Sequence, residues 1–236
     1  LDGTLFPYTT LFRSARRIAD FVERDIVQKW LYYKPSITRP NLIGEDSDRY
    51  LLVVLNTSRA VREQFACICL DLHALGYDSH PYDQWANLLI ELYLTPRYGP
   101  DQPAPCEDRC AGRIPEDWGL PVFPTDDGAV CLGILDADPN NPTGVLDTSH
   151  ANRTAALAAK AYSKGLIDRA VLDGLANTLR YRIWAPEKGP FYFNNYVDGS
   201  DCDLGGLRPG RGGNIWFGWH RLAAYHPDLE ELFLAV

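Results

Sequence analysis

The chain contains no methionine, little positive charge and no long apolar run. Its 23 lysines and arginines are outnumbered by 31 aspartates and glutamates, which gives a formal net charge of −8 over 236 residues. A nucleic-acid partner would favour a basic face, so this balance argues against one. No run of about 18 apolar residues occurs, and no membrane-spanning segment is therefore expected.

Several common motifs are also missing. No GxGxxG follows a strand and no GxxxxGK[ST] is present, so Gly205–Gly206 and Gly210–Gly213 do not support nucleotide binding. The GxSxG turn that presents a nucleophilic serine is absent as well. We therefore expect no cofactor. Arg211 lies within the second glycine segment, where anion binding is plausible but unspecific.

The absence of methionine extends to position 1, which suggests a chain that is processed or incomplete. Pro7–Ser14 (PYTTLFRS) resembles a translated sequencing adapter. We therefore expect residues 1–14 to lie outside the fold, as tags and scars do. The remaining residues, 15–236, are expected to form one globular domain, because 46% hydrophobic content at this length can bury a sizeable core.

The six cysteines are sparse for a chain of this length. Cys67 and Cys69 lie in an apolar segment, where cysteine commonly behaves as a small hydrophobic residue. Cys106 and Cys110 lie in a proline-rich stretch, where they suit a local disulfide, two free thiols or two zinc ligands. These alternatives stay open, so the cysteines decide neither the compartment nor a metal site.

Helical patterns dominate the chain. Over residues 14–33, apolar side chains recur at intervals of three and four, which is typical of an amphipathic helix, and Pro35 ends the pattern. The spacing returns from Val61 to Leu75, and Gly76 suits a left-handed helix end. Further helices are expected over residues 81–93, 150–164, 168–183, 215–225 and 229–234.

Two segments fit this pattern less well. The apolar run from Asp46 to Leu55 is followed by Asn56–Ser58, whose side chains compete for backbone hydrogen bonds and bend or interrupt a helix. Residues 97–142 are rich in proline and glycine and contain one apolar run, Ala129–Leu135, which suits a strand or a buried extended segment. The aromatic residues and cysteines of this long stretch favour an ordered, packed loop over a disordered one.

The last third of the chain carries the strongest indication of function. Asp147–His150 (DTSH) opens a helix, Phe191–Gly199 (FYFNNYVDG) forms an aromatic loop, and Gly212–Leu222 (GGNIWFGWHRL) follows. Aromatic rings stack on the apolar faces of sugars, and amides, histidines and arginines hydrogen-bond their hydroxyls. These residue types at helix-connecting loops therefore predict a carbohydrate-binding cleft.

The helical hairpins, the three motifs above and the ending GWHRLAAYHP resemble the (α/α)-toroid enzymes that act on uronate polysaccharides. This group includes alginate-lyase-like, heparinase-like and glucuronyl-epimerase-like domains. The resemblance covers residues 147–228. It implies an all-α fold of antiparallel helical hairpins that form a partial (α/α) toroid with one long ordered loop region. It also implies that residues 15–236 are an N-terminally truncated toroid.

The resemblance further implies an acidic polysaccharide or oligosaccharide as the partner, and elimination or epimerisation as the reaction. Such enzymes neutralise the sugar carboxylate, remove the proton on the adjacent carbon and stabilise the resulting enediolate. A lyase of this kind would be periplasmic or secreted. The implied proton-transfer pair is His150 and Tyr196. The implied amide donors are Asn194 and Asn195. The residues implied to bind the sugar carboxylate are Arg153, His220 and Arg221. The implied sugar platforms are Trp184, Tyr192, Trp216 and Trp219.

Other interpretations of the same residues stay open. Trp216 and Trp219 share a helix face and also suit a core. Asp147 and Asp198 suit the two carboxylates of a glycoside hydrolase with the same architecture. The carboxylates of Asp198, Asp201 and Asp203 suit either a calcium site or a solvated acidic turn, although their spacing differs from an EF-hand. A non-catalytic helical module or an inactive fragment is the alternative from outside the enzymes.

Overall fold

The computed structural model describes residues 6–27, 59–94, 123–124, 130–131, 146–189, 191–201, 213, 215 and 217–234. These residues are mostly helical, as an all-α fold requires, and their one ladder pairs β1 (Phe123–Pro124) with β2 (Val130–Cys131) antiparallel. The chain divides into two compact units, Leu1–Ala86 and Asn87–Val236. The toroid arrangement stays a prediction.

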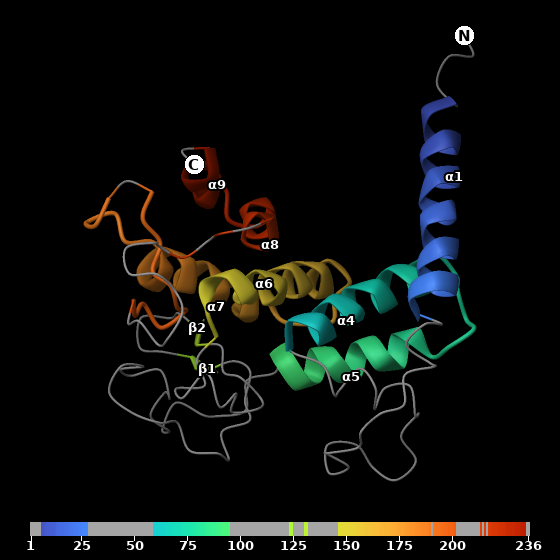
Figure 1. The fold of residues 1–236 in the computed structure, drawn as a ribbon, viewed down its shortest axis with the longest axis horizontal. Helices are drawn as coiled ribbons and strands as arrows, with labels where there is room; N and C mark the ends of the chain where they lie inside the picture. Colours follow the sequence, from blue (N-terminus) through green and yellow to red (C-terminus); the bar gives the residue numbers. More distant parts are fainter. Residues whose placement is uncertain are drawn as a thin grey trace. The chain divides into compact units, whose positions relative to one another are not determined.

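The first unit contains α1 (Phe6–Phe21), the π-helical turn η1 (Val22–Val27), α4 (Arg59–Ala74) and the first residues of α5 (Tyr82–Leu94) (Figure 1). The helix expected over residues 14–33 thus begins earlier, at Phe6. No proline or glycine follows Pro7 before the end of α1, and proline is tolerated in the first turn of a helix. The adapter-like segment therefore does not coincide with a break in secondary structure.

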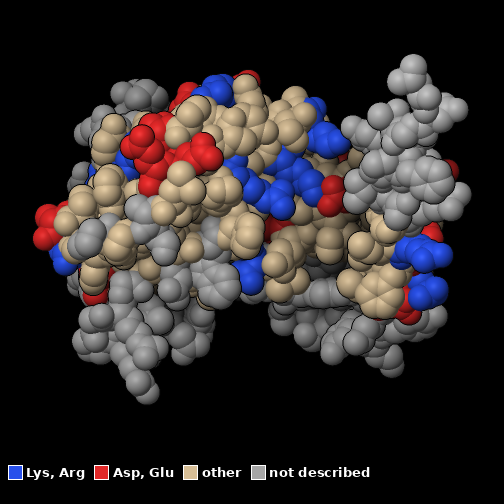
Figure 2. All heavy atoms as spheres, turned by 90° about the horizontal axis from the view of Figure 1, so that it is seen from above, with Lys and Arg blue, Asp and Glu red and all other residues tan. Residues whose placement is uncertain are grey.

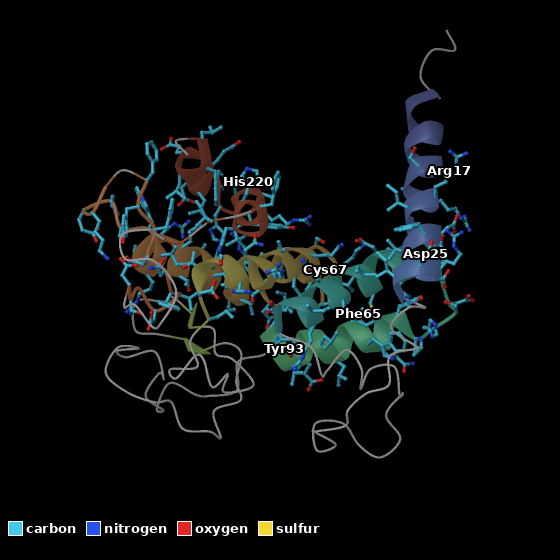
Figure 3. The ribbon with its side chains drawn as sticks, viewed as in Figure 1. Arg17, Asp25, Phe65, Cys67, Tyr93 and His220 are labelled. Atoms are coloured by element: carbon cyan, nitrogen blue, oxygen red, sulfur yellow. The ribbon has the colours of Figure 1, made fainter. Side chains whose placement is uncertain are left out.

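The apolar spacing of α4 produces its buried side. Phe65 (labelled in Figure 3), Cys69 and Leu72 are buried at intervals of four and three residues. The ring of Phe65 lies 5.9 Å from that of Trp85. The helix ends as expected at Gly76, whose φ of 81° is left-handed. Leu72 O accepts a hydrogen bond from Tyr77 N at 3.0 Å, which closes a glycine-dependent helix end.

Hydrogen bonds join the first helix to the turn that follows α4. The Tyr77 hydroxyl donates to the Asp20 carboxylate, and the Ser79 hydroxyl donates to that of Glu23. The Tyr82 hydroxyl also donates to Glu23, at 3.4 Å. Burial and the nearby Glu23 charge raise the pKa of Tyr82 to about 12, so this phenol stays a donor at neutral pH.

The second unit contains the predicted helical hairpin. The two helices, α6 (Thr148–Ser163) and α7 (Arg169–Thr178), fold back on each other across Gly165 (Figure 1). The φ of Gly165 is 70°, and Leu166 N donates to Ala161 O at 3.0 Å, so this end has the same form as that of α4. The remaining elements are the π-helical η3 (Leu179–Ile183), α8 (Phe217–His220), the 3₁₀-helical η4 (Arg221–Ala224) and α9 (Asp228–Leu234).

Small residues allow close packing in the second unit. Ala151, Ala155 and Ala158 form a fully buried strip along α6. Gly218 of α8 packs against the backbone of Asn152, where a Cβ atom would overlap the Asn152 carbonyl oxygen. Alanine and glycine thus bring α6 and α8 closer than helices with larger side chains could approach.

The expected helices over residues 81–93, 150–164, 168–183, 215–225 and 229–234 correspond to helical segments of the structure, with shifts of a few residues at their ends. Within the described parts of the chain, no helix has the length and apolar content needed to cross a membrane. Some expectations fall outside the described residues. These concern the apolar run 46–55, the cysteines at 106 and 110, Arg211, Trp216 and Asp203.

Candidate functional site

The start of α6 is built around one carboxylate. Asp147 has the extended conformation of a helix N-cap, and its Oδ1 accepts hydrogen bonds from His150 N at 2.9 Å and from Ser149 Oγ at 2.6 Å. Its Oδ2 lies 2.5 Å from Nδ1 of the His150 ring. Asp147 therefore caps the helix and holds the imidazole with the same carboxyl group.

The electrostatics of this pair favour an ionised Asp147. Burial tends to raise the pKa of Asp147, but hydrogen bonds from the His150 ring and Ser149, together with the charge of His150, lower it overall. A carboxylate at Nδ1 favours the tautomer with the proton on Nδ1, which leaves Nε2 as the basic nitrogen of the neutral ring. The His150 side chain is 56% exposed, against 24% for Asp147, so the oriented ring faces solvent.

The aromatic loop is attached directly to this helix start. Thr148 N donates to Asn195 O at 2.8 Å, and Thr148 Oγ1 donates to Asn194 O at 2.7 Å. An isolated antiparallel bridge joins Asp147 to Tyr196. Two of the three motifs found in the sequence, 147–150 and 191–199, thus meet at one place.

The two predicted residues Asn194 and Tyr196 lie inside this junction rather than on its surface. Asn194 is 7% exposed, its Nδ2 donates to Arg182 O at 2.7 Å, and its Oδ1 accepts from Lys188 Nζ at 2.7 Å. Tyr196 is 5% exposed. The Asn194 amide already has protein partners at both ends, so in this conformation it holds the loop together.

A second carboxylate organises the far side of the loop. Asp201 accepts hydrogen bonds from Lys188 Nζ at 2.7 Å, from the Tyr192 hydroxyl at 2.8 Å and from Asn195 N at 2.7 Å. Burial acts to raise the pKa of Asp201, but these three donors and the Lys188 charge lower it. The hydrogen bond to Asp201 in turn raises the pKa of Tyr192. Nothing in the sequence had marked Lys188, because a lysine in a Pro-Glu-Lys-Gly turn has no distinctive spacing.

The predicted sugar platforms are placed differently from one another. Trp184 is partly exposed, and its backbone forms an isolated antiparallel β-bridge with Phe193. Tyr192 is half-buried, and Lys188 Nζ lies 5.2 Å from the centre of the Tyr192 ring. Trp219 is fully buried, and its indole N–H donates to Thr148 O at 3.0 Å. Trp219 is therefore a core residue, the alternative left open by its helix spacing, and offers no exposed ring face.

The predicted carboxylate-binding residues lie on α6, α8 and η4. Arg153 follows His150 by one turn of α6 and is half-buried. His220, labelled in Figure 3, is exposed on α8, with its ring 5.1 Å from that of Phe233. Arg221 is exposed at the start of η4. The Gly218 N–H donates to Asn152 Oδ1, so α8 and α6 are tied within a few residues of these positions.

The acidic turn after Tyr196 has local partners. Asp198 Oδ1 accepts from Ser200 N at 2.9 Å and from Ser200 Oγ at 2.7 Å, and Asp201 is paired with Lys188. Within the residues that the structure describes, no group of three or more His, Cys, Asp or Glu side chains is arranged to hold a metal ion. Asp198 and Asp201 thus serve the turn and the loop in this structure.

The described contacts combine an exposed histidine, oriented by a carboxylate, with an adjoining loop of aromatic, amide and lysine side chains. Such a histidine is chemically suited to take up and return a proton. The exposed ring of Trp184 and the half-buried ring of Tyr192 are suited to stacking on a ligand with apolar faces. The chain matches no family model, no curated protein and no solved structure.

Proposed function

We propose that this chain belongs to an enzyme that transfers a proton on an acidic, uronate-containing polysaccharide, with His150 as the base. The observation that supports the proposal is the contact of 2.5 Å between His150 Nδ1 and Asp147 Oδ2 at an exposed helix start. A carboxylate in this position fixes the ring orientation and stabilises the imidazolium that forms when the other nitrogen accepts a proton.

The proposed step begins at the carbon next to the sugar carboxylate. Nε2 of His150 takes the proton from this carbon. A double bond then forms between this carbon and the neighbouring carbon, while the bond between the neighbouring carbon and the glycosidic oxygen breaks. The imidazolium then returns the proton to the leaving oxygen. In an epimerase a second acid would instead donate a proton to the opposite face of the same carbon, and the His150 imidazolium would lose its proton to solvent. Tyr196 is buried, so this step assigns it no proton transfer and leaves it a role in the loop.

A substrate carboxylate would find favourable electrostatics near α6. The partial positive charge at the N-terminal end of α6 is already matched by the Asp147 carboxylate, so a substrate carboxylate would depend on basic side chains. This helix includes Arg153 and Lys160 but no aspartate or glutamate from Thr148 to Ser163. Figure 2 shows a group of Lys and Arg side chains and a separate group of Asp and Glu side chains on the same face of the molecule, although the net charge is −8. Local positive charge is thus compatible with an acidic chain.

The glycoside hydrolase alternative is supported less well by the same contacts. A hydrolase needs one carboxyl group that stays protonated near neutral pH to act as the acid. The pKa of Asp147 is lowered, and its two oxygens already bind His150 and Ser149. Asp147 is therefore better suited to hold the histidine than to protonate a leaving group.

The test uses the full chain and a panel of uronate polymers. Elimination leaves a double bond conjugated to the carboxylate, which absorbs in the ultraviolet, so absorbance should rise in the wild type. His150→Gln should lose about 10²-fold or more of the turnover, the usual scale for a missing general base. His73→Gln, at an exposed histidine of α4, is the matched control and should retain full turnover.

Each other outcome has a defined meaning. New reducing ends without absorbance would replace the proposal with the hydrolase. Incorporation of solvent deuterium with inversion and no cleavage would identify an epimerase and keep His150 as the base. Turnover that survives His150→Gln would remove His150 from the chemistry. Absence of both turnover and sugar binding in a folded wild type would favour the non-catalytic module.

A further inference from the structure

A histidine outside the candidate site lies between two helices and two arginines. His226 occupies the turn between η4 and α9, and its side chain is only 11% exposed. Its Nδ1 lies 3.4 Å from Arg180 Nη2, which comes from η3 after α7. Its Nε2 lies 3.1 Å from Asp173 Oδ1 of α7, an ion-pair distance without hydrogen-bond alignment.

The Arg180 contact decides which ring nitrogen carries the proton. A guanidinium group has only donors, so Nδ1 of His226 must be the acceptor and must lack a proton. The neutral ring then carries its proton on Nε2, on the side that faces Asp173. Uptake of a second proton would place an N–H on Nδ1 directly against the N–H groups of Arg180, and the hydrogen bond would be lost.

Charged groups from three elements act on this ring. Arg169 and Asp173 come from α7, Arg180 from η3 and Asp228 from α9. Burial and the two arginines oppose protonation, whereas the two aspartates favour it. Their balance lowers the pKa of His226 below its ordinary value of 6.5.

The same groups fasten the start of α9 to η3 and the turn before α9 to α7. Arg180 Nε donates to Asp228 Oδ2 at 2.7 Å, and Arg169 Nη2 donates to Tyr225 O at 2.8 Å. Asp173 Oδ1, which faces His226, also accepts from Arg169 Nε at 2.8 Å. Both arginines that hold the start of α9 therefore act on the His226 ring as well.

We propose that His226 is an acid-sensitive latch, whose neutral ring keeps the start of α9 and the turn before it attached to η3 and α7, and whose protonation releases this attachment. Acid favours release because the released ring recovers its ordinary proton affinity and therefore takes up a proton more readily than the docked ring. Docking is fully stabilised above pH 6.5 and is lost as the pH falls through the lower pKa of the docked ring.

Release of α9 would also reach the neighbourhood of His150. The chain runs from α8 through η4 to α9, and α8 is bonded to the start of α6 through Trp219 Nε1 and Thr148 O. The latch itself does not depend on the proposed enzymatic function, because its residues and its measurement lie in α7, η3 and α9.

The first experiment measures the His226 ring in the full ¹⁵N-labelled chain by long-range ¹H–¹⁵N correlation during a pH titration. His226→Gln assigns the signal. The latch requires the Nε2–H tautomer and a titration midpoint below 6.5. A proton on Nδ1, or a midpoint at or above 6.5, would overturn it. Arg180→Gln should move the midpoint upward, because one opposing cation is removed, and an unchanged midpoint would also count against the latch.

The second experiment follows amide exchange in α9 at pH 7.5 and 5.5, corrected for the intrinsic pH dependence of exchange. In the wild type and in the His73→Gln control, protection of Asp228–Leu234 should fall as the pH falls. The fall should not exceed about tenfold per pH unit, the limit for uptake of one proton. His226→Gln should abolish this fall if circular dichroism shows that the variant is folded. An equal fall in that variant would overturn the latch, and if the variant does not fold, the ring titration and Arg180→Gln decide.

Discussion

At the scale of single residues, Asp147 shows what a sequence motif can and cannot reveal. The pattern Asp-Thr-Ser-His predicts a helix start, because a carboxylate before the first turn accepts backbone N–H groups. The second contact, between Oδ2 and the His150 ring, depends on the rotamers of both side chains. Neither rotamer follows from spacing along the chain. The helix start was therefore predictable, and the orientation of the histidine was not.

The cap and the charge of Asp147 can be separated by two substitutions. Asp147→Ala removes both and should lower the free energy of unfolding by about 0.5–2 kcal/mol, the usual range for a lost N-cap. Asp147→Asn keeps a good capping side chain and should lose less stability, although it loses the ionised partner of His150. Urea denaturation at pH 7 measures both. Equal losses in the two variants would show that the charge, rather than the cap, stabilises the helix.

Asp201 predicts a dependence of stability on pH. The pKa of Asp201 in the folded chain is lowered from its ordinary value of 3.8. The contribution of Asp201 to stability is therefore present above pH 3.8 and is lost as the pH falls through the lower pKa of the folded chain. Asp201→Asn should therefore weaken the loss of stability on acidification, measured by urea denaturation between pH 2.5 and 7. Asp168→Asn, at a helix cap whose side chain makes no cap hydrogen bond, is the control. A loss of stability on acidification that is the same in Asp201→Asn as in the wild type would contradict the prediction.

At the scale of helices, the alanine and glycine content predicted which segments are helical but not how closely the helices pack. The Ala-rich segment after His150 was expected to be helical, and it forms α6. The sequence did not indicate that α8 would pack its Gly218 against the α6 backbone, because such an approach joins residues 66 positions apart. Burial of Trp219 follows from the same approach. Its role as a core residue thus depends on a contact that local periodicity does not contain.

This close packing predicts that two glycine substitutions destabilise the chain for different reasons. A Cβ atom at Gly218 would overlap the Asn152 carbonyl oxygen, so Gly218→Ala must separate α8 from α6 and should cost at least about 1–3 kcal/mol. Gly165→Ala meets no atom within 4 Å and is opposed only by its φ of +70°, a cost of about 1–2 kcal/mol. Chemical denaturation compares the two variants. A Gly218→Ala variant as stable as the wild type would show that the helices do not pack this closely.

At the scale of the whole chain, local and non-local contacts were unequally predictable. Helix positions follow from apolar periodicity and from glycine and proline at helix ends, which act over a few residues. The attachment of the aromatic loop to α6 rests on hydrogen bonds from Thr148 to the backbone of Asn194 and Asn195, almost 50 positions away. Any residue presents the same carbonyl group, so no side-chain pattern marks this pairing. The predicted arrangement of the helices in a toroid would be a non-local property of the same kind.

The first helix provides a test of how much the N-terminal residues contribute. The hydrogen bonds described between this helix region and the α4–α5 turn begin at Arg16 O, which accepts from the Tyr77 hydroxyl at 3.5 Å, and continue at Asp20 and Glu23. Removing residues 1–14 leaves all of these groups in place. The melting temperature should therefore fall by no more than a few degrees, since about 1 kcal/mol corresponds to roughly 2–4 °C in a chain of this size.

The matched variant lacks residues 1–27. It loses the hydrogen-bonding carboxylates together with the buried side chains of Ala19 and Val27, and its melting temperature should fall by a clearly larger amount. Thermal unfolding followed by circular dichroism compares both deletions with the full chain. If removal of residues 1–14 alone costs as much as removal of residues 1–27, the adapter-like segment stabilises the fold and our expectation that it lies outside the domain is wrong. A small loss in the first variant and a large loss in the second would place the start of the stabilising contacts between residues 15 and 27.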